Sequence, residues 1–418
     1  MAFGDPTITV FFGTGVNPTA FTLNDATKGQ LDDATYTLGG DVGTDVTADC
    51  YSISVRRGRD REFDEFSAGT CTIQLYNWDG DYLTRNPSSP YAGNLVPGKR
   101  VRVQIWNQTI FEGIVAHWES QDDSDGIKLA ELGVEDALAQ LGRIEFDGWT
   151  ATGSQTAGPR LDAALNRPEV NFAANRDFST GVSVLQADPI GQGSNVLSYC
   201  QLVAQSDLGA FFATRSNQLR FRDRHDVPTN VEASQTSPRF HHDIDFCTVD
   251  EPPVLPFQSH GTTSGSDYLN TRVVVEREGG VAQPVEDAAS IELYGVRTLS
   301  FSGLLQNSDE QALAMAEFLL GAVADPREHV NLIAVDLSAY PVVGMPPDRV
   351  ARLDLHDFCY LSLPFDAGVL LRIEGIDHDI KVGGSHVMTL HLSEAMQAAS
   401  FILDDFFYGR LDNTPLGF

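Results

Sequence analysis

The residues whose types best suit metal binding are a pair of histidines followed by two aspartates. It consists of His241, His242, Asp243 and Asp245. Imidazole and carboxylate side chains are common zinc ligands, so the residue types suit a metal site. Adjacent residues of an extended chain point to opposite sides, however, and we expect the two imidazoles not to converge on one ion. We therefore interpret the group as part of a solvated connection and predict neither a metal nor a cofactor.

Two other short motifs match ligand-binding loops only in part. Asp79 and Asp81 flank Gly80 as at the start of a calcium loop, but the remaining ligands of that pattern are missing. Residues 191–194 (Gly-Gln-Gly-Ser) look like half of a phosphate loop, but no third glycine and no lysine follow. We interpret the first as a turn between strands and the second as the turn that begins a helix.

Hydrolytic chemistry needs an activated nucleophile or paired carboxylates. The sequence has no Gly-x-Ser-x-Gly, His-Glu-x-x-His or Cys/His arrangement. Its 58 acidic residues guarantee chance pairs of carboxylates, but no glutamate lies in an evidently apolar context that would raise its pKa. We predict that the protein is not an enzyme and keep a hydrolase as an alternative.

The strongest local positive charge is a run of four arginines. They are Arg56, Arg57, Arg59 and Arg61. They could meet an acidic surface across a subunit boundary, where ion pairs would fix register and orientation. Alternatively, they pair within their own domain. The acids available for this are Asp60, Glu62, Asp64 and Glu65.

The composition excludes several classes of protein. The 418 residues include 28 Lys and Arg against 58 Asp and Glu, a net charge of −30, so the surface as a whole cannot wrap nucleic acid. An acidic surface can keep a protein in solution, or it can line a channel past which DNA slides. Five scattered cysteines form no disulfide framework and no zinc knuckle. We expect no signal peptide in residues 1–15 and no membrane span.

Alternating apolar and polar residues predict a β-rich N-terminal domain. The alternation is clearest at 52–55, 71–75 and 101–105. A period of two is what a sheet with one buried face requires. A short helix at 135–141 ends the unit, and we predict a β-barrel or sandwich over residues 1–145.

The next segment, residues 146–235, has the pattern of a small α+β insert. Pro159 is placed to begin one helix, and Ser194 is a candidate N-cap for a second. Two short strands are predicted at 210–214 and 218–222, around a polar turn.

Residues 236–395 are predicted to form a second β-rich domain that carries one long helix. Their first part, 236–270, is rich in Pro, His and Ser and is interpreted as an extended connection. Ser308 and Gln311 have the spacing of a capping box and mark the start of the helix. The predicted fold class is mainly β, with a small α+β domain inserted between two β domains.

The last segment, residues 396–418, is too short to fold alone but is rich in large apolar residues. Its aromatic residues include Phe401, Phe406, Phe407, Tyr408 and Phe418. Such a set is unusual in a tail that is free in water. We predict that these residues contact another subunit or another protein.

Five short motifs between Arg56 and Arg102 occur in a distinctive order. They are a basic turn at 56–63, an Ala-Gly-Thr strand at 66–71, an Asn-x-Asp-Gly turn at 75–82, an Asn-x-Ser-Ser-Pro-Tyr loop at 86–91, and Leu-x-Pro-Gly at 95–98 before a Val-Arg-Val strand. Each motif alone is ordinary turn chemistry. In this order they closely resemble the minor tail proteins of long-tailed phages (siphophages), particularly those of actinobacterial hosts.

The resemblance extends over residues 40–395. Its further motifs lie at 206–212, 219–224, 293–297 (Leu-Tyr-Gly-x-Arg), 325–327 and 373–378. The sequence departs from the family at Asp207, where Glu is usual, and at His356-Asp357, where Gly-Asp is typical. We expect neither departure to bear on chemistry.

The resemblance implies a baseplate hub, a structural ring at the tail tip. Such hubs are usually homotrimers in which each subunit supplies two β-barrel domains related to the tail-tube fold, so that a pseudo-sixfold ring results. It further implies a virion protein made in the host cytoplasm. The implied partners are the distal tail protein, the tape-measure protein and receptor-binding tip proteins, with DNA passing through the lumen during ejection.

Two alternatives remain open. Within the same class, the chain could be the hexameric distal tail protein that caps the tube above the hub. From another class, it could be a tail-associated cell-wall hydrolase or a carbohydrate-binding tip protein. A hydrolase predicts a convergent acidic or metal site in a pocket, whereas a hub predicts broad apolar interfaces and a ring.

Overall fold

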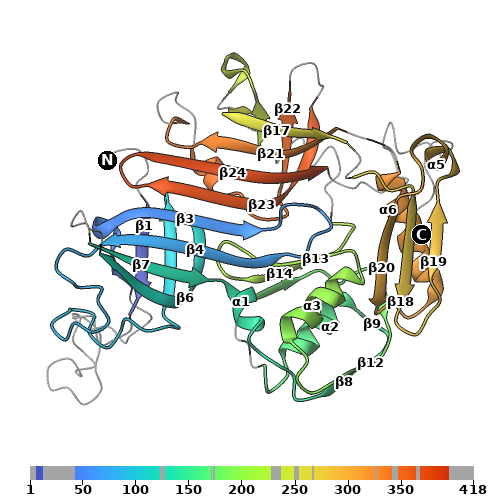
Figure 1. Cartoon of the computed structure of the whole chain (residues 1–418), viewed down its shortest axis with the longest axis horizontal. Coiled ribbons are helices and arrows are strands. Elements are labelled where there is room, and N and C mark those ends of the chain that lie inside the picture. Colours follow the sequence, from blue (N-terminus) through green and yellow to red (C-terminus); the bar gives the residue numbers. More distant parts are fainter. Residues whose placement is uncertain are drawn as a thin grey trace, which may run out of the picture.

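The computed structural model describes residues 6–12, 43–122, 128–170, 172, 175–226, 237–248, 254–265, 268–324, 326, 328–340, 347–363 and 368–394. Two β-rich units lie side by side, and two smaller helix-containing units pack beside them (Figure 1). Phe401, Phe406, Phe407, Tyr408 and Phe418 lie outside the described residues. No helix within the described ranges is long and apolar enough to cross a membrane.

The first β unit is an antiparallel sheet that curls around its own core. Its elements are β1 (Thr7–Phe11), β2 (Thr44–Asp45), the 3-10 helix η1 (Thr47–Asp49), β3 (Cys50–Gly58), β4 (Ser67–Tyr76), β5 (Arg100–Ile105), β6 (Gln108–Asp122) and β7 (Lys128–Glu135). The strands pair in the order β3–β4–β7–β6–β5–β1–β2. The predicted alternation is confirmed in β4, where Cys71, Ile73 and Leu75 are buried. They share a core with Ile8 of β1, near the opposite end of the strand order, so the sheet must curl.

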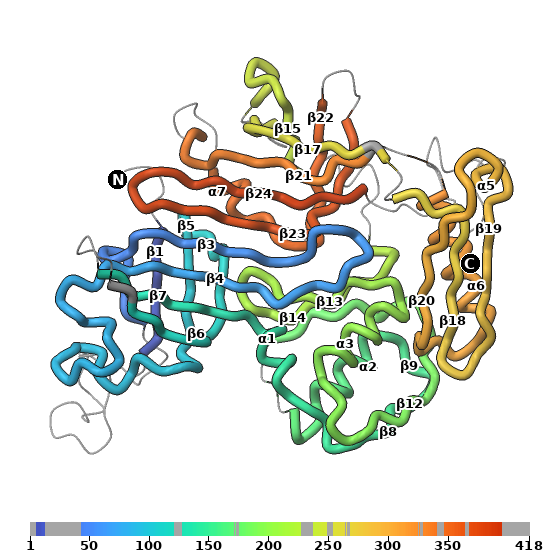
Figure 2. The backbone as a smooth tube through the Cα atoms, viewed as in Figure 1, coloured from blue at the N-terminus to red at the C-terminus, as the bar shows by residue number. Residues whose placement is uncertain are grey.

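The second β unit continues the same sheet. Its elements are β15 (Arg239–His241), η2 (Ile244–Phe246), β16 (Val254–Pro256), β17 (Ser259–Ser264), β21 (Glu328–Asp336), α7 (Pro347–Ala351), β22 (Phe358–Ser362), β23 (Val369–Lys381) and β24 (Ser385–Glu394). One edge of β23 pairs with β24, and the other pairs first with β22 and then with β3. The antiparallel β3–β23 pairing runs from Ser52↔Lys381 to Gly58↔Gly375. The described strands of both units thereby form one sheet of fourteen strands (Figure 2).

The prediction that residues 236–270 form an extended connection is wrong. β15, β16 and β17 lie in this segment and belong to the large sheet, where Phe240 and Leu255 are fully buried. Strands of three residues are too short to show a period of two, so no alternation marks β15 or β16 in the sequence.

The insert between the β units mixes short strands and helices, as predicted. Its elements are α1 (Ala137–Leu141), β8 (Trp149–Ala151), β9 (Gln155–Thr156), α2 (Ala157–Leu165), β10 (Arg176–Phe178), β11 (Val184–Leu185), β12 (Asp188–Ile190), α3 (Val196–Gln205), β13 (Ala210–Ala213) and β14 (Leu219–Arg222). The N-cap of α3 is Asn195, whose side chain accepts from the backbone N–H of Ser198, and the choice of Ser194 was wrong by one residue. The insert shares one apolar core with the second β unit.

A further small unit has a core of its own. It contains β18 (Arg272–Arg277), β19 (Gln283–Glu286), α5 (Ala288–Tyr294), β20 (Thr298–Leu304) and α6 (Asp309–Val323). The strand order is β19–β18–β20, and α6 packs on this sheet. Ser308 caps α6 by accepting the backbone N–H of Gln311. Oε1 of Gln311 has no hydrogen-bond partner among the described residues, so only half of the predicted capping box forms.

Candidate functional site

Part of the arginine run lies where the two β units meet. Arg57, at the end of β3, is buried, and its Nη1 lies 2.7 Å from Oδ1 of Asp354 in the second β unit. Asp354 also accepts the backbone N–H of Arg215 in the insert. Arg56 instead pairs on the surface with Asp60 at 2.8 Å. One buried carboxylate thus holds both β units and the insert together.

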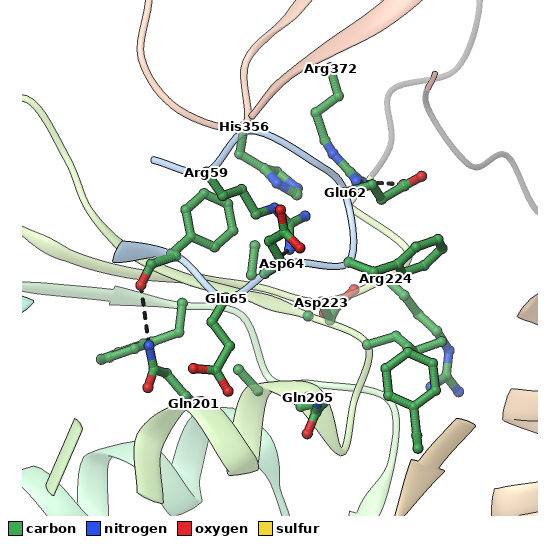
Figure 3. Close-up of a pocket in the computed structure, with 18 of the residues that line it drawn as sticks. Arg59, Glu62, Asp64, Glu65, Gln201, Gln205, Asp223, Arg224, His356 and Arg372 are labelled. Atoms are coloured by element: carbon green, nitrogen blue, oxygen red, sulfur yellow. Dashed lines mark hydrogen bonds and ion pairs between the residues drawn. The ribbon is translucent and has the colours of Figure 1, made fainter. Parts of the chain in front are cut away.

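Arg59 belongs to a buried network around Glu374 of β23. Oε2 of Glu374 lies 2.7 Å from Nε of Arg59, and its Oε1 lies 2.7 Å from Nε of Arg372. Nη2 of Arg372 reaches Oε1 of Glu62 at 2.8 Å (Figure 3). Ser393 of β24 donates its hydroxyl to Glu374. The 59–66 loop of the first β unit is therefore fastened to β23 by charge-assisted hydrogen bonds.

These contacts separate the four arginines into two kinds. Arg57 and Arg59 are occupied inside the chain by acids 297 and 315 positions away, and not by the neighbouring acids that the sequence offered. Arg56 uses one of those neighbouring acids, and both Arg56 and Arg61 are exposed. A contact with a neighbouring subunit can therefore be proposed only for Arg56 and Arg61.

The two carboxyl groups of the Glu374 network differ in pKa. Burial alone would raise the pKa of Glu374, but the guanidinium groups of Arg372 and Arg59 outweigh burial and hold that pKa well below its usual range. Burial raises the pKa of Glu62 to about 7; Arg372 opposes this shift and the negative charge of Glu374 adds to it. The expectation that no glutamate has a raised pKa is therefore wrong for Glu62, because burial at this junction cannot be seen in the sequence.

We expect the free energy of unfolding of Glu62→Gln, relative to wild type, to increase as the pH rises. The carboxyl of Glu62 has a pKa of about 7 in the folded chain against an ordinary value of 4.5, so folding favours its protonated form. The stability that comes from binding this proton is fully present below the pKa of Glu62 in the unfolded chain. It is lost as the pH rises through the pKa of Glu62 in the folded chain. The amide cannot ionise. Between about pH 5 and about pH 8, the free energy of unfolding of the variant relative to wild type should rise by up to about 3 kcal/mol. Chemical denaturation across this range measures it, and a difference independent of pH would contradict the assignment.

A pocket opens beside the network (Figure 3). The empty space at the pocket is about 790 Å³ when the open solvent at its mouth is counted. Its walls come from the 59–66 loop, the insert, the small α/β unit and the second β unit. Its aromatic lining is Phe63, Phe66, Phe211, Phe301 and Phe318. All four structural units thus meet around one cavity.

His356 lies in the wall of this pocket with an unusual backbone conformation. Its φ is +68°, in the left-handed region that favours glycine. Neither ring nitrogen has a hydrogen-bond partner among the described residues. Burial lowers the pKa of His356 well below its usual range, and Arg372 adds to this, so the ring is neutral. The residue that departs from Gly at this position therefore lines the pocket.

Asp207, the other departure, is fully buried. Its carboxylate accepts the backbone N–H groups of Val182 and Ser183. Burial raises its pKa to about 6, although these hydrogen bonds oppose the shift. Asp207 therefore holds a turn of the insert in place.

The candidate ligand motifs lie in short strands, bends and turns. No three His, Cys, Asp or Glu side chains of the described residues gather in a metal-binding arrangement. The rings of His241 and His242 stack with centroids 4.6 Å apart, so the two side chains do not point to opposite sides as an extended chain would place them. At 77–82 and at 191–194 the backbone forms turns, with Gly80 and Gly193 at positive φ.

The predicted fold class, mainly β with an α+β insert, is confirmed, and solved structures of phage tail proteins share this fold. The 43 kDa tail protein of prophage MuSo2 from Shewanella oneidensis superposes with a TM-score of 0.56 at 11% identity, over 94% of this chain and 98% of that one. The tail protein from Neisseria meningitidis MC58 superposes with a TM-score of 0.59 at 11% identity, over 93% and 96%. Neither the family models nor the curated sequences that were compared match the chain.

Proposed function

We propose that this chain is a structural hub of a phage tail tip and forms a ring around the path of the DNA. The observation that carries the proposal is the edge-to-edge joining of two β units into one sheet, in a fold shared with phage tail proteins. A chain of this kind can present two β units to a ring, so that three chains fill six positions. A closed ring of three would then join a sixfold tube to a threefold tip.

This role requires the two β units to keep one relative orientation. The β3–β23 pairing supports it, and the buried pairs Arg57–Asp354 and Arg59–Glu374 reinforce the same junction. Ion pairs that are desolvated and well aligned resist separation more strongly than exposed ones. The chain is thereby suited to act as one stiff segment of a ring.

The partners and location that we propose follow from this role. They are the distal tail protein, the tape-measure protein and the receptor-binding tip proteins of a virion, with DNA passing through the lumen without specific binding. The net charge of −30 suits a channel wall that repels phosphate. If the chains line such a channel, acidic side chains should be enriched on the inner wall of the ring. A neutral or basic inner wall would contradict this role for the acidic charge.

Copy number tests the proposal directly. Native mass spectrometry of the purified 45.5 kDa chain should show a trimer. A hexamer would favour the distal tail protein. A chain that stays monomeric at all concentrations would contradict the ring.

We expect reversal of the exposed arginines to weaken assembly without unfolding the chain. Arg56→Glu combined with Arg61→Glu places negative charge where we propose an acidic neighbour, and should raise the dissociation constant of the ring by about tenfold or more. Arg143→Glu is the matched control, because Arg143 is also an exposed arginine beside a single acid. Sedimentation measures the assembly. If both reversals weakened assembly equally, the proposed subunit contact of Arg56 and Arg61 would be contradicted.

One observation bears on the hydrolase alternative. Glu62 lies in a pocket and has a pKa of about 7, which is a property of general acids. Its carboxyl is engaged by Arg372, and we propose that this pairing has a structural role. Incubation with peptidoglycan should release no soluble fragments. Release by wild type but not by Glu62→Gln would make the chain a hydrolase.

A further inference from the structure

The pocket beside the Glu374 network has no part in the proposed ring, and its lining favours an apolar occupant. Phe63, Phe301 and Phe318 are only partly buried there. Phe63 and Phe301 meet edge to face, with centroids 6.4 Å apart. Apolar surface left in contact with water is unfavourable, so an aromatic side chain entering the pocket would be stabilised.

The charges around the pocket argue against a strongly charged ligand. Its lining includes three arginines and four acids, namely Arg59, Arg224, Arg372, Glu62, Asp64, Glu65 and Asp223. Arg59 and Arg372 already form ion pairs. Phosphate or nucleic acid would need an excess of free cations, and this nearly balanced lining does not offer one.

His356 indicates that the occupant also carries a polar group. This side chain is more than nine-tenths buried, lines the pocket, and has no hydrogen-bond partner for either ring nitrogen among the described residues. An unpaired buried polar group is unfavourable, and a ligand with a donor or acceptor would satisfy it. A polypeptide supplies both an aromatic side chain and backbone N–H and C=O groups.

The described part of the chain ends next to this pocket. Ser393, near the end of β24, donates a hydrogen bond to Glu374, which is bound by the pocket residues Arg59 and Arg372. Residues 395–418 follow directly. An extended chain from residue 394 to Phe401 spans about 23 Å, so the first aromatic residue of the segment can reach the pocket without strain.

We propose that residues 395–418 fold back onto this pocket of the same chain and insert an aromatic side chain from the 401–408 run among its phenylalanines. A polar group of the segment bonds His356. The segment then ties together the four units that meet at the pocket. This places it on its own chain, whereas the sequence suggested a neighbour, and the inference is independent of the ring.

A photo-crosslinking experiment on the full chain tests this. Benzoylphenylalanine replaces Phe401, Phe406 or Phe407, one at a time, and crosslinked peptides are mapped by mass spectrometry in a mixture of light and heavy chains. Crosslinks to 59–66, 201–211 or 301–318 within one chain are expected for at least one position. The same probe at Tyr51, an exposed aromatic of β3, is the control and should not label these segments.

Three outcomes would overturn the proposal. Crosslinks only between light and heavy chains would assign the segment to a second copy. Crosslinks to other surfaces, or no crosslinks above the control, would also contradict it.

A second variant tests the role of His356. His356→Gly suits the left-handed backbone, so it should fold, and it removes the imidazole. The variant should lower the crosslink yield severalfold. An unchanged yield would show that His356 does not contact the C-terminal segment.

Discussion

Glu374→Gln should cost about 3–5 kcal/mol of the free energy of unfolding. The substitution preserves size but removes the negative charge that two guanidinium groups share. Arg372 would then remain at the buried junction paired with Glu62, and Arg59 would lose its carboxylate partner Glu374. Breaking a buried pair is this costly because a desolvated charge stays behind. Chemical denaturation followed by circular dichroism measures the loss.

Glu112→Gln is the control for this prediction. Glu112 pairs with Arg102 at 2.7 Å, but the arginine is one-third exposed. Such a pair contributes about 1 kcal/mol or less. If Glu374→Gln were no more destabilising than Glu112→Gln, the junction between the β units would not depend on the network.

Gly58→Ala should destabilise the chain by about 4 kcal/mol or more. Gly58 ends β3 at a φ of +94°, where an L side chain is strained. A Cβ there would overlap the carbonyl oxygen of Glu374 and lie 2.7 Å from Cα of Gly375. The same carbonyl accepts the backbone N–H of Arg59, so the β3–β23 pairing itself would have to shift.

Gly98→Ala separates backbone strain from the steric clash. Gly98 has a similar φ of +86°, but a Cβ there would meet nothing within 4 Å. We expect this control to cost only the conformational term, about 1–2 kcal/mol. Thermal unfolding of both variants measures the difference. Equal losses would mean that the close approach of β3 and β23 is not needed for stability.

The fold could be predicted from the sequence where periodicity is long enough to read. The alternation of β4 and the cap of α6 at Ser308 each identify an element. The pattern is harder to read in β23. Its second half contains His378, which is buried beside His386 at 3.0 Å, and a buried polar pair of this kind interrupts the apolar pattern.

The site could be predicted only in part, because its contacts are long-range. The sequence identified the arginines, but Asp354 and Glu374 lie about 300 positions away and carry no local signal. The pocket was missed because it forms only where four units meet. The resemblance offered one signal, because it implies Gly at the position of His356, and a left-handed backbone favours glycine.

We propose that three chains form a ring to which each contributes two β units, and reconstruction of the tail tip in the particle is the most direct test. We expect three copies around the DNA path, with the first and second β units of each chain at successive positions of a pseudo-sixfold ring. Six copies that each contribute one β unit, or a position away from the tail axis, would contradict it.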